Sequence, residues 1–318
     1  MNAFVKKITI GSFAAKNNLM LAPMAGITDT PFRIHCLNNG AGIVCAEMVS
    51  AKAVEYDNKK SVKMLAVDKK EHPVSMQIFG GDAESISIAA KAAEAAGADI
   101  IDINAGCPVK KINRAGAGCV LIKDEKLLAS IVNAAVNSVS IPVTLKTRIG
   151  LTAGDFKGDK IAKLAENEGA AAVIMHARYA GNVHGGPADL EALAKVVSAV
   201  KIPVIGNGGI VDVNTADKMF ETGVRGIMVG RGAIGNINIF KSIINGCDIE
   251  LNPKENVKIF FNLIKQNVNF YGEKNGIARS RKTVGFWIKG FPMAGEIRGE
   301  FVKLNTLAAV QKLFGEYL

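Results

Sequence analysis

Short apolar segments alternate with longer helix-like segments from residue 19 to about residue 240, and the short segments end in polar or glycine-containing sequence. This alternation, with strands apolar throughout, is typical of a parallel sheet whose faces are covered by helices. The expected strands are residues 19–24, 43–47, 74–78, 100–104, 143–146, 172–176, 203–206 and 226–230. Helices are expected at residues 82–96, 120–138, 159–168, 189–200 and 212–221. The eight units predict an α/β fold, a (β/α)8 TIM barrel, and a doubly wound sheet is the alternative.

The chain is long enough for a barrel and a smaller second domain, since it has 318 residues, of which 49% are hydrophobic. We expect residues 1–243 to form the barrel domain, with residues 8–15 as a hairpin that closes its floor. After residue 244 the strand signals stop and amphipathic helical patterns take over, so residues 244–318 are expected to form a small helical domain. The residues expected in its core are Ile259, Leu263, Ile264, Val302, Leu307, Val310 and Phe314.

Cysteine and histidine usage narrows the class of protein further. The five cysteines form no CxxC pair, which favours reduced thiols and a cytoplasmic location. The four histidines have no metal-type spacing, so no metal site is expected. Apolar runs stay shorter than the roughly 18 residues of a membrane span. No membrane association is therefore expected.

Positive charge is concentrated toward the C-terminus. The formal net charge is +10, and residues 241–318 carry twelve Lys or Arg against seven Asp or Glu. Such an excess favours a polyanionic partner, although a solvated helix face is the simpler interpretation of charge alone. Arg279, Arg281 and Lys282 form the densest group.

The strand ends differ chemically from the strand interiors. In a barrel all eight ends open onto one face, which is where active sites lie. The ends carry Pro23-Met24, Glu47, Gln77, Asn104 with Cys107, Lys146 with Arg148, His176 with Arg178, Asn207-Gly208 and Gly230-Arg231. Chemically distinctive residues at all eight equivalent positions, polar at most of them, indicate one site rather than a solvated rim.

Two of these ends suggest a phosphate. The sequences at 206–209 and 230–232 are glycine-rich and follow the last two strands, where barrels commonly hold a phosphate group. Glycines let backbone N–H groups face the anion, and Arg231 adds a fixed charge. A flavin with Lys146 and Gln77 at its ring fits this pattern. An aldolase or a pyridoxal enzyme that uses Lys146 fits the same residues equally well.

Motifs in a fixed order resemble those of the tRNA-dihydrouridine synthases. The segment 22–33 (APMAGITDTPFR) is similar to their opening motif, and the segment 102–111 (DINAGCPVKK) to their catalytic loop. The segments 145–148 (LKTR), 176–178 (HAR), 205–208 (IGNG) and 229–232 (VGRG) continue the series. The segment 278–290 is similar to the helical tail of the bacterial DusB-type branch. The resemblance covers almost the whole chain.

The resemblance implies an enzyme that uses flavin mononucleotide (FMN) and NADPH to reduce selected uridines of tRNA to 5,6-dihydrouridine. Carried over by position, Cys107 is the general acid. The implied flavin contacts are Pro23, Met24, Ala25, Gln77, Lys146, His176, Asn207, Gly208, Gly230 and Arg231. Asn104 and Arg178 are implied at the uracil, and the basic tail with Arg279, Arg281 and Lys282 at the tRNA.

The implied reaction suits these residues. A hydride reaches C6 of the uracil from reduced flavin, and a thiol near its ordinary pKa of about 8.5 can give the proton to C5. The target uridine is expected to flip out of the folded tRNA, and a monomer would suit so bulky a substrate. Two other functions stay open: a barrel flavoenzyme that acts on a free pyrimidine, and a catalytically silent RNA-binding protein.

Overall fold

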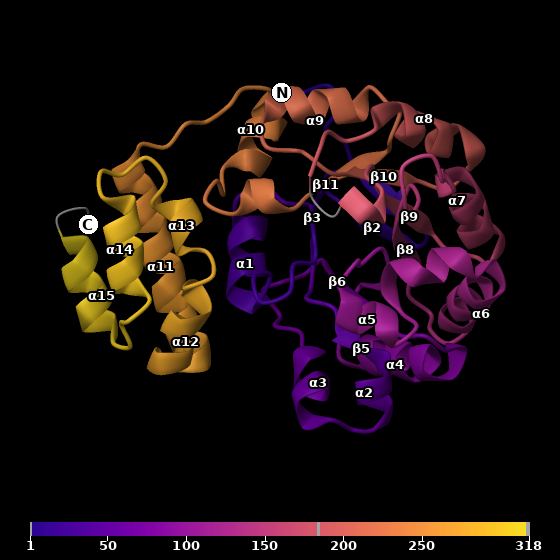
Figure 1. The fold of residues 1–318 in the computed structure, drawn as a ribbon, viewed down its shortest axis with the longest axis horizontal. Helices are drawn as coiled ribbons and strands as arrows, with labels where there is room; N and C mark the ends of the chain where they lie inside the picture. Colours follow the sequence, from indigo (N-terminus) through magenta and orange to yellow (C-terminus); the bar gives the residue numbers. More distant parts are fainter. Residues whose placement is uncertain (1, 183–184, 316–318) are drawn as a thin grey trace.

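The computed structural model describes residues 2–182 and 185–315 and contains a closed barrel of eight parallel strands (Figure 1). The strands are β3 (Leu19–Leu21), β4 (Ile43–Cys45), β6 (Val74–Phe79), β7 (Ile100–Ala105), β8 (Val143–Arg148), β9 (Ala172–His176), β10 (Val204–Asn207) and β11 (Gly226–Val229). Strand β3 pairs with both β4 and β11, and β4 pairs with β6, so the ring closes. The short β5 (Val49–Ser50) adds to β6. The predicted barrel is confirmed over the doubly wound sheet.

Helices surround this ring and cover the outward faces of its strands. They are α1 (Thr30–Asn38), α2 (Ala51–Glu55), α3 (Lys59–Met64), α4 (Ala83–Ala95), α5 (Lys110–Arg114), α6 (Glu125–Val136), α7 (Gly158–Asn167), α8 (Leu190–Ala199), α9 (Val213–Phe220) and α10 (Ile239–Asn245). Five of them begin after an aspartate whose carboxylate accepts from a backbone N–H of the first turn, which fixes where each helix starts. These aspartates are Asp29, Asp82, Asp124, Asp189 and Asp212.

One helix prediction was too long. The single helix expected at residues 120–138 is divided into a 3-10 segment, Gly118–Lys123, and α6. The Asp124 carboxylate caps α6 by accepting from Leu127 N at 3.0 Å, so a new helix begins there. Apolar periodicity alone did not reveal this break, because buried residues continue on both sides of it.

The N-terminal hairpin closes one end of the barrel, as the sequence predicted. Strands β1 (Ile8–Ile10) and β2 (Phe13–Ala15) pair antiparallel. Their buried side chains form an apolar cluster with residues from the barrel strands, such as Ile43, Ile100 and Ala172. This cluster plugs the end from which the strands begin, and chemistry is left to the opposite end.

Helices follow the barrel, and they pack beside α1 (Figure 1). They are α11 (Pro253–Tyr271), α12 (Glu273–Ser280), α13 (Val284–Trp287), α14 (Ala294–Phe301) and α15 (Leu307–Phe314), called the helical part below. Phe260 stacks on Trp287 with ring centroids 5.6 Å apart, and Phe301 and Phe314 complete an aromatic core. Among the predicted core residues Val302 was wrong, since it is exposed. No described helix is both long and apolar enough to cross a bilayer.

Candidate active site

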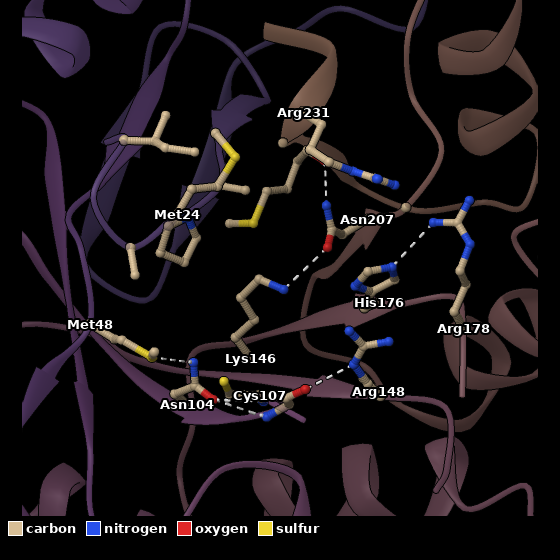
Figure 2. A pocket seen from close by; sticks show the side chains of 18 of the residues that line it. Met24, Met48, Asn104, Cys107, Lys146, Arg148, His176, Arg178, Asn207 and Arg231 are labelled. Carbon is tan, nitrogen blue, oxygen red and sulfur yellow. Dashed lines mark hydrogen bonds between the residues drawn. The ribbon is translucent and has the colours of Figure 1, made fainter. Parts of the chain in front are cut away.

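A cavity of about 650 Å³ opens at the carboxyl ends of the barrel strands (Figure 2). Its volume lies within the range of small-molecule and cofactor sites. The residues predicted for the catalytic, cofactor and uracil positions all line it: Pro23, Met24, Ala25, Gln77, Asn104, Cys107, Lys146, His176, Arg178, Asn207, Gly208, Gly230 and Arg231. They come together because parallel strands present their last side chains at one mouth.

The backbone of the loop after β7 is held by hydrogen bonds from two sides. Asn104 Oδ1 accepts from Cys107 N at 3.0 Å and from Gly106 N at 3.2 Å. Arg148 Nε donates to the Gly106 carbonyl oxygen at 2.8 Å, and Cys119 N donates to the Cys107 carbonyl oxygen at 3.0 Å. The half-buried Cys107 side chain therefore projects into the cavity from a well-fixed loop.

The Cys107 thiol is protonated at neutral pH in these surroundings. Burial raises its pKa above the ordinary 9.0, while a backbone hydrogen bond from Val109 and the nearby Arg148 and Lys146 oppose this rise. A thiol of this kind is a poor nucleophile, because the thiolate is the reactive form. It can serve as a proton donor.

Asn104 is itself oriented by a buried row of side chains that crosses three strands. Gln77, Asp102 and Thr144 are register partners on β6, β7 and β8. Asp102 accepts from Gln77 Nε2 at 2.6 Å and from Thr144 Oγ1 at 2.7 Å, and Gln77 Oε1 accepts from Asn104 Nδ2 at 2.8 Å. Burial raises the pKa of Asp102 to about 6. Sequence reasoning missed Asp102, although a lone acid inside an apolar strand was a visible signal.

Lys146 is half-buried on β8, two residues before the strand ends, and points across the cavity toward β10 (Figure 2). Its ammonium donates to Asn207 Oδ1 at 3.2 Å, and Asn207 Nδ2 donates to the Met228 carbonyl oxygen at 2.7 Å. The pKa of Lys146 is lowered to about 8, chiefly by burial; Asp102 opposes this shift, and Arg148 adds to it. A desolvated lysine at this position would strongly attract an anionic or polarised ligand atom.

Three arginines line the cavity, and Figure 2 shows Arg178 beside His176 and Arg148 beside the Cys107 loop. Arg178 Nη1 lies 3.4 Å from His176 Nε2, and Arg178 Nε donates to the Gly186 carbonyl oxygen at 2.9 Å. Arg231 is near enough to lower the pKa of Arg178. Arg148 instead contacts the Cys107 loop. The sequence placed Arg148 beside Lys146 at one strand end, but it assigned a role to the lysine alone.

Comparison with known proteins identifies the family of this chain. The model of the "Dihydrouridine synthase (Dus)" family matches residues 20–315. The chain belongs to the dihydrouridine synthase family. It is 39% identical over 319 residues to "tRNA-dihydrouridine synthase B" of Pseudomonas aeruginosa, covering 97% of this chain and 96% of that protein. A "Probable tRNA-dihydrouridine synthase" of Rickettsia conorii is 35% identical, covering 98% and 96%. The family resemblance of the sequence motifs is confirmed, and this dihydrouridine synthase is an enzyme.

Solved structures support the fold of this dihydrouridine synthase. The old yellow enzyme homologue from Zymomonas mobilis superposes with a TM-score of 0.59 at 14% identity, covering 79% of this chain and 94% of that one. Morphinone reductase gives a TM-score of 0.56 at 14% identity, covering 79% and 91%. At such low identity the likeness concerns the barrel fold alone.

The three basic residues expected at the tRNA do not line the cavity of this dihydrouridine synthase. Arg279 joins the helical part to the barrel: its guanidinium lies 3.4 Å from Asp29 Oδ2 and 3.9 Å from Glu47 Oε2 and stacks over Tyr271. Arg281 donates to the Leu304 carbonyl oxygen at 2.8 Å. The Lys282 amine packs against Gly26, beside the cavity loop. Their contact with tRNA stays a prediction.

The helical part reaches the cavity through Phe286 of α13. Sequence reasoning missed this residue, because nothing in the local pattern shows that α13 touches the barrel. Within residues 2–182 and 185–315, no group of three or more His, Cys, Asp or Glu side chains is arranged to hold a metal ion.

Proposed function

We propose that this dihydrouridine synthase reduces selected uridines of tRNA to 5,6-dihydrouridine, with FMN as cofactor and NAD(P)H as electron donor. The similarity to proteins named "tRNA-dihydrouridine synthase B" supports tRNA as substrate. The observation that carries the chemistry is the protonated Cys107 thiol, which stands on a hydrogen-bonded loop and faces a cavity of about 650 Å³. This is what a reduction that ends in proton transfer requires.

The lining residues fit an FMN. Lys146 offers a half-buried cation, and Gln77 offers an amide that can meet the amide-like edge of a flavin ring. Gly208 has φ +120° and leaves no side chain between the backbone and the cavity, and a Cβ there would come within 2.9 Å of the His176 ring. Arg231 lines the same end and would bind a phosphate through its fixed charge.

In the proposed reaction the chain's own groups hold and protonate the uracil. Reduced FMN, when bound, supplies a hydride to C6 of the uracil ring. The Cys107 thiol then gives its proton to C5, and the resulting thiolate is reprotonated from solvent. Asn104 and Arg178 are assigned to the uracil, and Arg148 holds the Cys107 loop. Since a stacked base cannot reach the cavity, the uridine enters it flipped out of the tRNA.

The two parts of the chain divide this work. We assign catalysis to a barrel domain of residues 1–243 and tRNA binding to a helical domain of residues 244–318, in a monomeric cytoplasmic enzyme. The barrel supplies nearly all of the cavity lining, while the residues around α12 and α13 carry a cluster of positive charge.

Replacement of the thiol tests this function. For Cys107→Ala we expect bound flavin and normal flavin reduction by NADPH, while dihydrouridine formation in tRNA, measured by mass analysis, falls about 10²- to 10⁴-fold. Cys247→Ala is the matched control, since that free cysteine is exposed and lies outside the cavity. Near-normal product from Cys107→Ala would show that Cys107 is not the proton donor. Turnover of free uridine but not of tRNA would show that the substrate is a free pyrimidine nucleoside.

The pH profile provides a second test. Because burial raises the pKa of the Cys107 thiol above 9.0, its proton is available through the neutral range and is lost above that value. Single-turnover protonation should therefore stay level through pH 9 and fall only at a higher pH, once the pH exceeds the raised pKa of the thiol. A fall that begins near pH 7 would mean that another group supplies the proton.

A further inference from the structure

The helical part contributes an exposed aromatic ring to the active-site cavity. Phe286 lies on α13 (Val284–Trp287) and lines the cavity, and it is 45% exposed, whereas Val284 and Trp287 in the same short helix are buried. The Phe286 backbone packs closely on Gly235 of the barrel, where a Cβ would collide with the Phe286 carbonyl oxygen. The backbone that carries the ring is thus held at a fixed place relative to the barrel.

Two further apolar side chains are exposed on the lining of the same cavity. Val109 follows β7 and is 51% exposed, and Val211 follows β10 and is 54% exposed. Polar side chains also line this cavity, among them the buried Asn104 and the half-buried Lys146. The cavity lining therefore includes three exposed apolar side chains, Phe286, Val109 and Val211, called the rim below. Apolar side chains exposed on the lining of one cavity indicate a binding surface.

The charge around Phe286 favours a nucleic acid as the occupant. From Lys274 to Gly295 the chain carries five Lys or Arg and no Asp or Glu. An exposed aromatic ring within a basic segment is typical of proteins that bind unpaired nucleotides, whose bases stack on the ring while their phosphates meet the cations.

We propose that Phe286 stacks on the nucleobase that adjoins the target uridine in the tRNA. This inference rests on the proposed function above. The flipped uracil has to pass the rim to reach Cys107, so the next nucleotide of the strand lies at the rim. That nucleotide has lost its stacking partner, and the Phe286 ring replaces it. The contact offsets part of the cost of base extrusion and sets how far the uridine enters the cavity.

Variants of the FMN-loaded full-length enzyme test this role. For Phe286→Ala we expect the Kd and the KM for unmodified tRNA to rise about 5- to 150-fold, which corresponds to the 1–3 kcal/mol of one base–aromatic stack. Flavin content and the rate of flavin reduction by NADPH should not change. Phe286→Trp should retain tRNA binding, and because the single native tryptophan, Trp287, is buried, the emission of the new indole should respond to tRNA.

Phe4→Ala is the matched control. Phe4 is 39% exposed and stacks on Phe220, and its carbonyl oxygen accepts from Asn18 at the start of β3, the barrel end opposite the cavity. This variant should leave tRNA binding unchanged. Equal weakening by Phe4→Ala would overturn the proposal, as would a Phe286→Ala enzyme that binds tRNA normally or that loses flavin instead. If the wild-type enzyme itself fails to modify tRNA, the proposed function is wrong. If the wild-type enzyme modifies tRNA and Phe286→Ala binds tRNA equally well, only the stacking contact is refuted.

Discussion

At the scale of single residues, the direction of the hydrogen bonds around Asp102 decides how the active-site amides face. An ionised carboxylate can only accept, so Gln77 turns its Nε2 toward Asp102 and its Oε1 toward Asn104. Asn104 must then donate to Gln77, which leaves its Oδ1 to accept from the backbone of the Cys107 loop. One buried acid thus orients two side chains and a loop.

Asp102→Asn should disturb this orientation. The new amide nitrogen would face either Thr144 or Gln77 Nε2, and in the second case Gln77 loses its acceptor or has to turn over. Leaving a buried donor unpaired costs about 1–3 kcal/mol. We expect a loss of that size in the free energy of unfolding by urea titration, together with a slower proton transfer at retained flavin content. A variant with unaltered protonation kinetics would contradict the orienting role.

Titration of Asp102 adds a pH dependence with a definite sign. Because burial raises its pKa from 3.8 to about 6, the folded state binds this proton more tightly than the unfolded state does. Its contribution to stability is present below pH 3.8 and is lost as the pH rises through about 6. Asp102→Asn should remove this part of the pH dependence, as measured by urea unfolding at pH 4 to 7. An identical pH dependence in both proteins would show that Asp102 does not titrate as argued.

Some of these active-site residues could be predicted from the sequence and others could not. Lys146, Gln77 and Cys107 could be predicted because each stands at or just after a strand end, and all strand ends of a barrel meet. Asp102 stands out in the sequence as a lone acid in an apolar strand, but its orienting role could not be predicted. Its partners Gln77 and Thr144 lie on two other strands, and only the register of β6, β7 and β8 aligns them.

At the scale of elements, the turn after β10 has a backbone conformation with positive φ, which residues other than glycine rarely adopt. Gly208 has φ +120°, and a Cβ at this position would come within 2.9 Å of His176 Cδ2. The turn therefore requires glycine for two reasons: its positive φ is rarely adopted by other residues, and it packs closely on His176 at the end of the neighbouring strand β9. This is the end of the cavity that we assign to the cofactor.

Gly208→Ala should lower both stability and flavin binding. Backbone strain of this kind costs about 1–3 kcal/mol, and displacement of His176 adds to it. Gly154→Ala is a matched control for strain, since Gly154 has φ +86° but no atom within 4 Å of an added Cβ. We expect both variants to unfold at lower urea concentration, and Gly208→Ala alone to bind FMN more weakly by fluorescence titration. Equal FMN affinity in the two variants would contradict the packing argument.

Element boundaries show where sequence patterns stop being sufficient. The barrel strands could be predicted because they are apolar on both faces, a consequence of helices outside and packed side chains inside. The contact of α13 with the barrel could not, since it depends on the close fit of the Phe286 backbone on Gly235, some 50 residues earlier in the chain. Such long-range fits leave no local periodicity.

At the scale of the whole molecule, the question is whether net charge or local charge attracts the RNA. The formal charge of +10 raises the affinity for any polyanion, whereas a bound phosphate requires a cation at one place. Lys289 is exposed in the basic segment beside α13, and Lys16 is exposed just after the hairpin strand β2, which closes the opposite barrel end. Removing either lysine changes the net charge by the same amount.

Lys289→Ala and Lys16→Ala therefore separate the two effects. Each phosphate contact contributes about 0.7–0.9 to the slope of log affinity against log salt concentration, because binding releases condensed counterions. We expect Lys289→Ala to lower this slope for tRNA by about one and to weaken binding most at low salt, while Lys16→Ala leaves the slope unchanged. Filter-binding titrations from 50 to 300 mM salt would measure it, roughly spanning the range in which such contacts weaken. If both variants shift the curves in parallel without a change of slope, long-range attraction by the net charge dominates, and the helical part contributes no phosphate contact through Lys289.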